Sequence, residues 1–146
     1  MRMSTRGRYA LRAMVDLGLT GDAGPMQQEE IARRQGIPTA YLARLMTQLS
    51  RAGLVRGNRG PGGGYRLARP AAEINAGEVV RAVEGPLKIV ACMDPETGEP
   101  CARQARCVTT NVWQKVGDAI TAVLDGITLQ DLLDDARALE GGPAKK

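Results

Sequence analysis

The residues best suited to chemistry are three cysteines, Cys92, Cys101 and Cys107, in a chain that contains no histidine. Thiolate sulphur is a preferred ligand of zinc and of iron–sulphur clusters. The lack of histidine excludes Ser-His-Asp and Cys-His nucleophile systems and zinc sites that need an imidazole, so we do not expect an enzyme. An odd cysteine count without an apolar signal segment indicates metal or redox chemistry rather than a disulfide framework.

The spacing of the cysteines predicts a loop that can wrap around a metal. Eight residues separate Cys92 from Cys101 and five separate Cys101 from Cys107, and the first interval contains proline and glycine. We therefore expect the first two cysteines on a flexible loop and Cys107 at the start of a long helix. Buried free thiols and structural zinc stay open as alternatives, because this spacing matches no general motif.

Composition and charge indicate the size of the domain and the kind of partner that each part of the chain binds. With 146 residues, 43% hydrophobic and 25% charged, the chain has the size of one compact domain with an added arm. Its apolar runs are far shorter than the roughly 20 residues that span a bilayer, so we expect no membrane segment and a cytoplasmic location. Residues 1–70 carry 12 Lys and Arg against 4 Asp and Glu, whereas residues 71–146 carry 8 against 12. The resulting charges of +8 and −4 favour a polyanionic partner for the first part.

Three helices are predicted in the basic part. Apolar residues recur at three- and four-residue steps after a cap at Ser4 or Thr5, a short second helix spans 27–35, and Gly36 can end it in a left-handed conformation. Pro38 starts a third helix. Two short helices joined at Gly36 have the spacing of a helix-turn-helix. The exposed face of the third helix is suited to a major groove and comprises Thr39, Ala40, Ala43, Arg44, Thr47, Gln48 and Arg51.

A β-hairpin wing is predicted next. Residues 54–58 and 64–68 have the pattern of short strands, and the Arg-Gly-Pro-Gly-Gly segment 59–63 is too rich in glycine for a helix. Arg59 at the tip can approach a phosphate backbone or enter a narrow minor groove. A nucleotide-phosphate loop is the competing interpretation, but the segment lacks a Gly-Lys-Ser/Thr ending and joins two strands.

The acidic part completes the predicted organisation. Residues 1–70 form the winged helix-turn-helix, 71–108 a linking helix and cysteine-rich loop, 109–140 a dimerisation helix and a C-terminal helix, and 141–146 a flexible tail. The long helix has an apolar stripe of Val112, Val116, Ile120, Val123 and Ile127. This stripe favours a second copy of the chain, with packing onto the chain's own domain as the alternative. The predicted fold is mainly α with a small β-hairpin.

The last helix is expected to begin at Thr128, where Asp131 is placed for a capping box. The leucines that we expect this helix to bury are Leu129, Leu132, Leu133 and Leu139.

Several motifs together point to a known family. They are Met1-Arg2 with Gly7-Arg8-Tyr9-Ala10, Arg33-Gln35-Gly36-Ile37, Tyr41-Leu42, Gly53-Leu54-Val55 and, most specifically, Arg59-Gly60-Pro61-Gly62-Gly63-Gly64-Tyr65. Gly77-Glu78-Val79-Val80, the cysteine segment, Trp113 and Gly126-Ile127-Thr128-Leu129 extend the match over nearly the whole chain. The sequence resembles the IscR-type iron–sulphur transcriptional regulators, whose relatives include NsrR and RirA.

The resemblance implies a homodimeric regulator that binds double-stranded operator DNA and whose affinity follows the state of an iron–sulphur cluster, 2Fe-2S or 4Fe-4S, held by the three cysteines. It places the third helix in the major groove and the wing arginine in the minor groove. The DNA-binding positions it implies are Thr5, Arg6, Thr39, Tyr41, Arg44, Arg59 and Gly60. The alternative is a winged-helix regulator that has no cluster and works through thiol redox chemistry or zinc.

The sequence departs from the family at the fourth cluster ligand. Thr110 stands where the family type has a histidine, and Arg8 stands where NsrR has a ligating aspartate. Ala43 replaces a family glutamate, which weakens the expectation of IscR-like discrimination between two operator classes. A missing ligand favours a labile cluster, which we expect to order the cysteine loop and shift the two recognition helices when it binds. The fourth ligand is then another oxygen donor, a small exogenous molecule, a backbone group or a residue of the partner chain, and the candidate oxygen donors are Asp94, Glu96 and Glu99.

Overall fold

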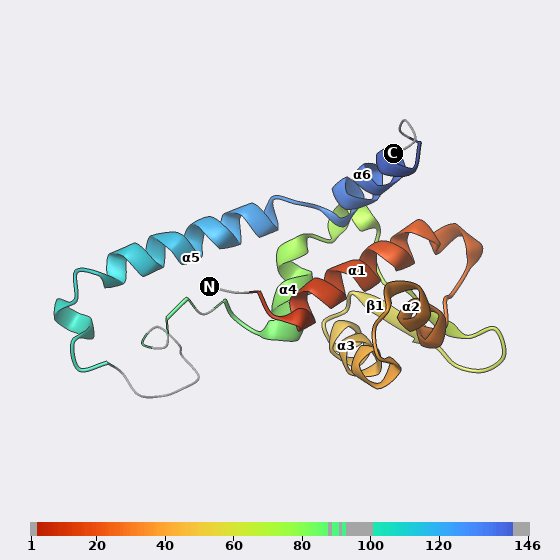
Figure 1. Ribbon diagram of the computed structural model, residues 1–146, viewed down its shortest axis with the longest axis horizontal. Coiled ribbons are helices and arrows are strands. Elements are labelled where there is room, and N and C mark those ends of the chain that lie inside the picture. The colour runs from red at the N-terminus through yellow and green to blue at the C-terminus, as the bar shows by residue number, and fades with distance from the viewer. Residues whose placement is uncertain (1–2, 88, 91, 93–100, 142–146) are drawn as a thin grey trace.

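A computed structural model describes residues 3–87, 89–90, 92 and 101–141 (Figure 1). Its helices are α1 (Thr5–Leu19), α2 (Gln28–Gln35), α3 (Thr39–Arg51), α4 (Ala76–Glu84), α5 (Thr110–Asp125) and α6 (Leu129–Gly141). Its strands are β1 (Val55–Asn58) and β2 (Gly64–Leu67), and short 3-10 turns are η1 (Gly21–Ala23), η2 (Ala71–Glu73) and η4 (Gln104–Arg106). The predicted class, mainly helical with one antiparallel hairpin, is confirmed.

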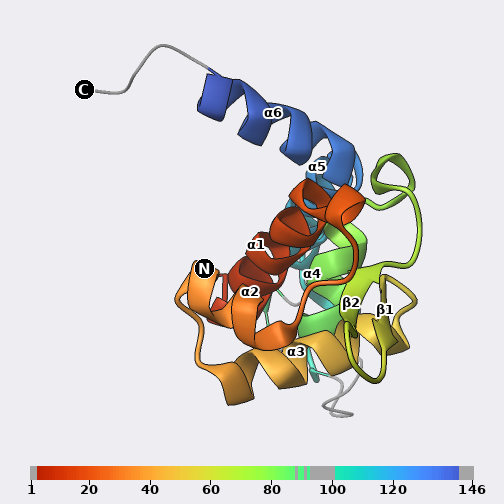
Figure 2. The same cartoon turned by 90° about the vertical axis from the view of Figure 1, so that its right-hand side faces the viewer.

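Helix α1 is the centre of the core. Its buried face contains Ala10, Ala13, Met14 and Leu17, and the two alanines let neighbouring helices approach closely. Burying a side chain such as Met14 or Leu17 contributes about 1.5–3 kcal/mol. Figure 2 shows α3 and α6 on opposite sides of α1. The core therefore connects the basic part of the chain with its last helix.

The turn between α2 and α3 follows from Gly36, which takes a left-handed conformation with φ of 64° and ends α2. The next residue, Ile37, is buried and donates its N–H to the carbonyl of Ala32 at 2.9 Å. Asp16 on α1 is 2% exposed and lies 2.8 Å from a terminal guanidinium nitrogen of Arg34 on α2. Removing Arg34 would leave a buried carboxylate unpaired, so this ion pair fixes α2 against α1.

The hairpin is joined directly to the helix-turn-helix. Met26, just before α2, exchanges two backbone hydrogen bonds with Tyr65 of β2, at 2.9 and 2.7 Å. Gly64 has φ of 139°, and a Cβ there would lie 2.5 Å from the Met26 carbonyl group. Only glycine allows this approach, so the wing keeps a fixed position beside α2.

A capping box fixes the start of α4. The Asn75 side chain accepts from the N–H of Glu78 at 2.9 Å, and the Glu78 carboxylate accepts from the N–H of Asn75 at 3.0 Å. The Glu78 carboxylate also lies 2.8 Å from the guanidinium of Arg69. These contacts link the end of the hairpin to α4.

Helix α6 starts as the sequence predicts, with reciprocal hydrogen bonds between Thr128 and Asp131. It packs on α1, where a Cβ on Gly18 would lie 2.7 Å from Leu133. Leu129 and Leu133 are buried and Leu132 is half-buried. The prediction that Leu139 is buried is wrong: it is 62% exposed, because the second half of α6 extends past the helical body (Figure 1).

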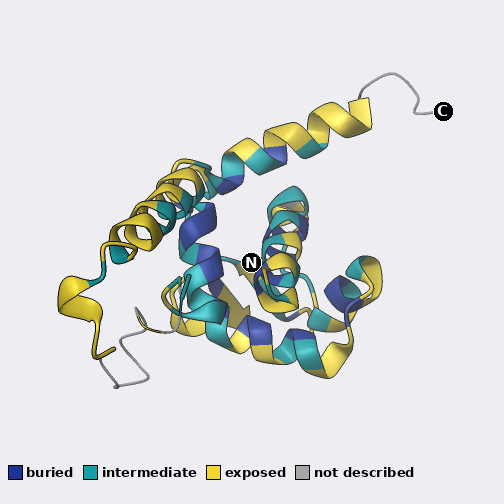
Figure 3. Cartoon of the chain, turned by 60° about the vertical axis from the view of Figure 1, so that its left-hand side comes forward, coloured by how far each residue is buried: buried dark blue, intermediate teal, exposed yellow. Residues whose placement is uncertain are grey.

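Helix α5 projects from the body and has no buried residue (Figure 3). It begins at Thr110, so the prediction that Cys107 opens the long helix is wrong by three residues. The backbone of Cys107 is extended, with φ of −89° and ψ of 104°, and this interrupts the helix. Of the predicted tail, Gly141 is the last residue of α6, and 142–146 lie outside the described residues.

Candidate nucleic-acid interface and cysteine segment

The outer face of α3 is polar, as its sequence predicts. The face turned inward contributes Leu42, Leu45, Met46 and Leu49 to the core. Outside, Thr39, Arg44, Thr47 and Arg51 are exposed, whereas Tyr41 and Gln48 are half-buried. Anchoring of the apolar face leaves the polar face free to enter a groove of DNA.

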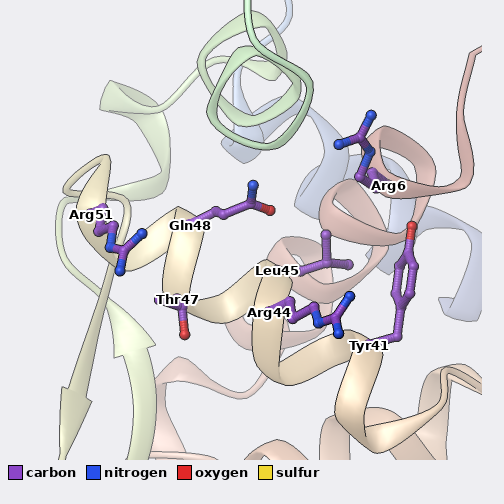
Figure 4. A pocket seen from close by; sticks show the side chains of 7 residues that line it. All are labelled: Arg6, Tyr41, Arg44, Leu45, Thr47, Gln48 and Arg51. Carbon is purple, nitrogen blue, oxygen red and sulfur yellow. The ribbon is translucent and has the colours of Figure 1, made fainter.

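A hollow of about 430 Å³ lies between this face and the first turn of α1. Figure 4 shows the side chains around it, which are Arg6, Tyr41, Arg44, Leu45, Thr47, Gln48 and Arg51. Three of these are arginines and none is acidic, so the surface is strongly positive. The structure thus brings three predicted DNA-binding residues together, Arg6 from α1 and Tyr41 and Arg44 from α3. Thr5 is exposed beside Arg6, and Thr39 is exposed at the start of α3.

Aromatic packing fixes Tyr41 at the edge of this hollow. Its ring meets the ring of Tyr9 edge to face, with centroids 5.7 Å apart. The guanidinium of Arg12 lies 5.4 Å from the centroid of Tyr9 and also donates to the side chain of Gln35 at 3.2 Å. Contacts of this kind each contribute about 0.5–1.5 kcal/mol. They join α1 to both helices of the helix-turn-helix.

The wing tip holds the other two predicted DNA-binding residues. Arg59 and Gly60 are exposed, and Gly60 has φ of 91°, a conformation that favours glycine. Together with Gln28 at the start of α2 they line a second hollow of about 370 Å³. The predicted positions therefore fall into two neighbouring groups, one at α1 and α3 and one at the wing.

Two arginines of the hairpin are basic residues that sequence reasoning missed. Arg56 on β1 and Arg66 on β2 are directly opposite in the register, and both are exposed. Like charges directly opposite each other destabilise a hairpin. A bound polyanion would relieve that repulsion, so the pair is a candidate extension of the interface. Alternation along two paired strands is the sequence signal that could have identified it.

The cysteine segment lies between α4 and α5. Cys92 and Cys101 are exposed and Cys107 is half-buried. Hydrogen bonds from the Thr109 hydroxyl, 2.9 Å from the sulphur, and then from Thr110 lower the pKa of Cys107 to about 7. The lowered pKa increases the share of thiolate at neutral pH, and the thiolate is the form that binds a metal.

Within the described ranges, no group of three His, Cys, Asp or Glu residues is placed so that it could hold a metal. The candidate oxygen donors Asp94, Glu96 and Glu99 lie outside the described residues. The donor set fits a metal centre in its chemistry: three thiols on one segment, accessible or nearly so. The described part of that segment does not gather them into one site.

The fold and the basic surface define a winged-helix DNA-binding protein. The Rrf2 family model, described as an iron-dependent transcriptional regulator, matches residues 3–135. The chain belongs to the Rrf2 family, and it is a transcriptional regulator and not an enzyme. Among the described residues, no helix has the length and apolar character needed to cross a membrane.

Individual relatives of this chain match it over nearly its full length. The chain is 38% identical to the HTH-type transcriptional regulator IscR of Escherichia coli over 140 residues, which cover 96% of this chain and 85% of that one. The structure of T. potens IscR matches with a TM-score of 0.80 and 38% identity, over 99% of this chain and 94% of that one. CymR, the global cysteine regulator of B. subtilis, matches with a TM-score of 0.71 and 33% identity, over 92% and 97%.

Proposed function

We propose that this protein is a cytoplasmic homodimer that binds operator DNA through α3 and the wing, with an affinity set by an iron–sulphur cluster on Cys92, Cys101 and Cys107. The observation that carries the proposal is the position of the cysteine segment. It lies between α4, which packs on the DNA-binding part, and α5, whose apolar stripe has Val112 and Val123 exposed and its other members half-buried. A cluster bound to this segment would therefore act on both α4 and α5.

For DNA, α3 supplies the groups that can distinguish bases. Arginine donates two parallel hydrogen bonds to guanine, and glutamine pairs with adenine in the same way. Arg44 and Gln48 are one turn apart on the face of α3 that lines the basic hollow (Figure 4). Arg6 and Arg59 flank that face and contact phosphate or the minor groove. Phosphate contacts position the protein, and α3 selects the sequence.

The proposed dimer rests on the two faces of α5. A hollow of about 310 Å³ between α5 and the body is lined on α5 by Trp113, Gly117 and Thr121, which recur every four residues and share one face. The stripe that contains Val112 and Val123 lies on another face, and these two valines are 50% and 62% exposed. A second copy of the chain covers this stripe and sets two α3 helices about 34 Å apart, as successive DNA major grooves require.

For the cluster, the three thiolates would be the ligands, and the protein keeps them accessible to solvent. A bound cluster supplies a group that iron supply or oxidation can change. Thr110, at the first position of α5, stands where the family resemblance implies a histidine ligand. We therefore propose a labile cluster with two or four irons, completed by a weak oxygen donor or an exogenous molecule.

Metal content tests this proposal. We expect chain purified without oxygen to contain iron and acid-labile sulphide in equal amounts and no stoichiometric zinc. Removal of the cluster should then change the affinity for operator DNA, measured by fluorescence anisotropy. The variant Cys107→Ser removes one of the three proposed ligands and should lose both the iron and the response of DNA affinity to cluster removal. Zinc in place of iron, or equal DNA affinity with and without cluster, contradicts the proposal.

A thiol switch without a cluster is the second candidate, and the exposure of Cys92 and Cys101 favours it. A structural relative of 35% identity, Staphylococcus aureus CymR, is described in an oxidized form. In this case DNA affinity should respond to peroxide in metal-free protein and recover with a dithiol reductant. A response only in iron-loaded protein excludes this candidate.

A further inference from the structure

The carboxylate of Glu84, the last residue of α4, lies at the N-terminus of α1. Its Oε1 accepts a hydrogen bond from the Ser4 hydroxyl and another from the backbone N–H of Gly7, at 3.2 Å. These partners are 80 and 77 residues away in the sequence. Glu84 is half-buried where α4 packs on α1, so the contact is part of the interface between these helices.

Together, Ser4 and Glu84 satisfy the first turn of α1. The Ser4 hydroxyl donates to Glu84 and accepts from the N–H of Arg6 at 3.2 Å. The N–H of Arg8 reaches the Ser4 carbonyl at 3.4 Å. A negative charge at a helix N-terminus is favourable because the free N–H groups carry a partial positive charge. Glu84 therefore supplies a negative charge at this end of α1 from within the protein, and the backbone of this turn is held by the protein itself.

The residue of this turn that faces Glu84 is Gly7, which has no side chain. A Cβ there would lie 3.5 Å from Oε1 of Glu84 and 3.0 Å from the sulphur of Met3. Gly7 is buried, whereas Thr5 and Arg6 on the same turn are exposed. The inner side of the turn is thus fixed on α4, and its outer side presents Arg6 to the basic hollow (Figure 4).

We propose that Glu84 is a positioning residue for DNA binding: it fixes the first turn of α1 so that Arg6 and Thr5 face the DNA. This inference rests on the proposed function, because it takes Arg6 to bind a phosphate. The proposal and a simple charge effect predict opposite changes in DNA affinity when Glu84 is removed. Removing an acidic residue near DNA should strengthen binding, whereas displacement of Arg6 weakens it.

The variants Glu84→Ala and Glu84→Gln test the proposal, with Glu73→Ala as a matched control that removes one exposed carboxylate from η2. The probe is a duplex of about 30 base pairs selected from a random library by the wild-type chain, long enough for two half-sites. We expect Glu84→Ala to weaken binding about tenfold, since it removes two hydrogen bonds to a charged group. Glu84→Gln keeps an acceptor oxygen and should recover most of the affinity. Glu73→Ala should leave it unchanged or slightly stronger.

Weaker DNA binding by Glu84→Ala could come from displacement of Arg6 or from a smaller amount of folded protein. The salt dependence of binding separates these two causes. If Arg6 of each protomer no longer binds its phosphate, the slope of log affinity against log salt falls by about 1.8 for a dimer, whereas a smaller folded fraction does not change the slope. In the Arg6→Ala background, Glu84→Ala should have a much smaller effect, limited to the displacement of Thr5. Tighter binding by Glu84→Ala, or an unchanged slope with additive effects of the two substitutions, overturns the proposal. If Glu84→Ala does not fold, Glu84→Gln and Ser4→Ala are compared in the same way.

These outcomes are distinct from a failure of the proposed function. If metal-free and iron-loaded chains bind DNA equally, cluster sensing fails while the salt slopes still test Glu84. If Arg6→Ala alone leaves the slope unchanged, Arg6 does not bind a phosphate and the inference fails with the interface intact.

Discussion

Arg81 on α4 and Asp125 in the last turn of α5 form an ion pair, with Nη1 and Oδ1 2.9 Å apart. Gly77 lies beside this pair, and a Cβ there would be 1.8 Å from the Asp125 oxygen. The pair connects the helix next to the DNA-binding part with the helix proposed to form the dimer. It is about one-third exposed, so its effect on stability is small, on the order of 0.2–1 kcal/mol.

Gly77→Ala should therefore break the ion pair and leave the free energy of unfolding within about 1 kcal/mol of the wild type. Loss of the pair is offset by the higher helix propensity of alanine, worth about 0.8–1 kcal/mol. Hydrogen exchange should show weaker protection in the last turn of α5. In an Asp125→Ala background the same substitution should raise the unfolding free energy by up to about 1 kcal/mol. A decrease in stability in that background would show that the remaining close contact, 2.8 Å to Nη1 of Arg81, is not relieved by movement of that side chain.

Arg59→Ala should reduce operator affinity about tenfold and lower the salt slope by about 1.8 for a dimer, since each protomer loses one charge at the DNA. Anisotropy titrations at several salt concentrations measure both quantities. Arg137→Ala removes the same charge from the exposed side of α6, across α1 from α3, and serves as control (Figure 2). If both variants behave alike, the wing has no direct contact with DNA.

Arg66→Gln should stabilise the protein and weaken DNA binding. It removes the repulsion with Arg56 on the opposite strand, worth about 0.2–1 kcal/mol, and also a positive charge of the candidate interface. Chemical denaturation measures the first effect and DNA titration the second. Adding Arg56→Gln should give no further increase in stability, because one charge alone has no partner to repel. Unchanged DNA affinity in Arg66→Gln would place the pair outside the interface.

Val123→Glu should prevent dimer formation, because it puts a charge into the apolar stripe of α5, where Val123 is 62% exposed. We expect monomers in sedimentation velocity and a decrease in operator affinity of more than tenfold, since two linked half-sites no longer bind together. Asn111→Glu adds the same charge on a different face of α5 and should remain dimeric. A dimer of normal affinity in Val123→Glu would mean that α5 does not form the dimer interface.

Glu78 should make stability depend on pH. Partial burial raises its pKa, but the hydrogen bonds from Asn75 and Arg69 outweigh burial, so the net pKa lies below its ordinary value of 4.5. A carboxyl group with a lowered pKa in the folded state adds stability above pH 4.5 that is lost as the pH falls through the folded-state value. Glu78→Gln should therefore destabilise the protein at about pH 7 and much less at about pH 3. Equal destabilisation at both pH values in urea denaturation would contradict the ionic role, and Glu73→Gln is the matched exposed control.

Local signals explain why so much of the DNA-binding part was predicted from the sequence. Gly36 ends α2 because glycine adopts a left-handed conformation without steric cost, and the glycines after Arg59 exclude a helix. Such features act within a few residues of each other. The same holds for the reciprocal bonds of Thr128 and Asp131, which start α6 where expected.

Contacts between distant segments were decided by the tertiary structure. Nothing near Glu84 in the sequence indicates that it meets Ser4, 80 residues away, or that Arg81 pairs with Asp125. The periodicity of the last helix predicted that Leu139 is buried, but burial depends on whether another helix covers the residue. At Leu139, α6 extends past α1, and the side chain is exposed. The sequence by itself determined the elements and the residue types of the interface, because those follow from local backbone and side-chain preferences. Which of these residues face each other was determined only when the helices packed, because packing depends on the shape and volume of all the elements together.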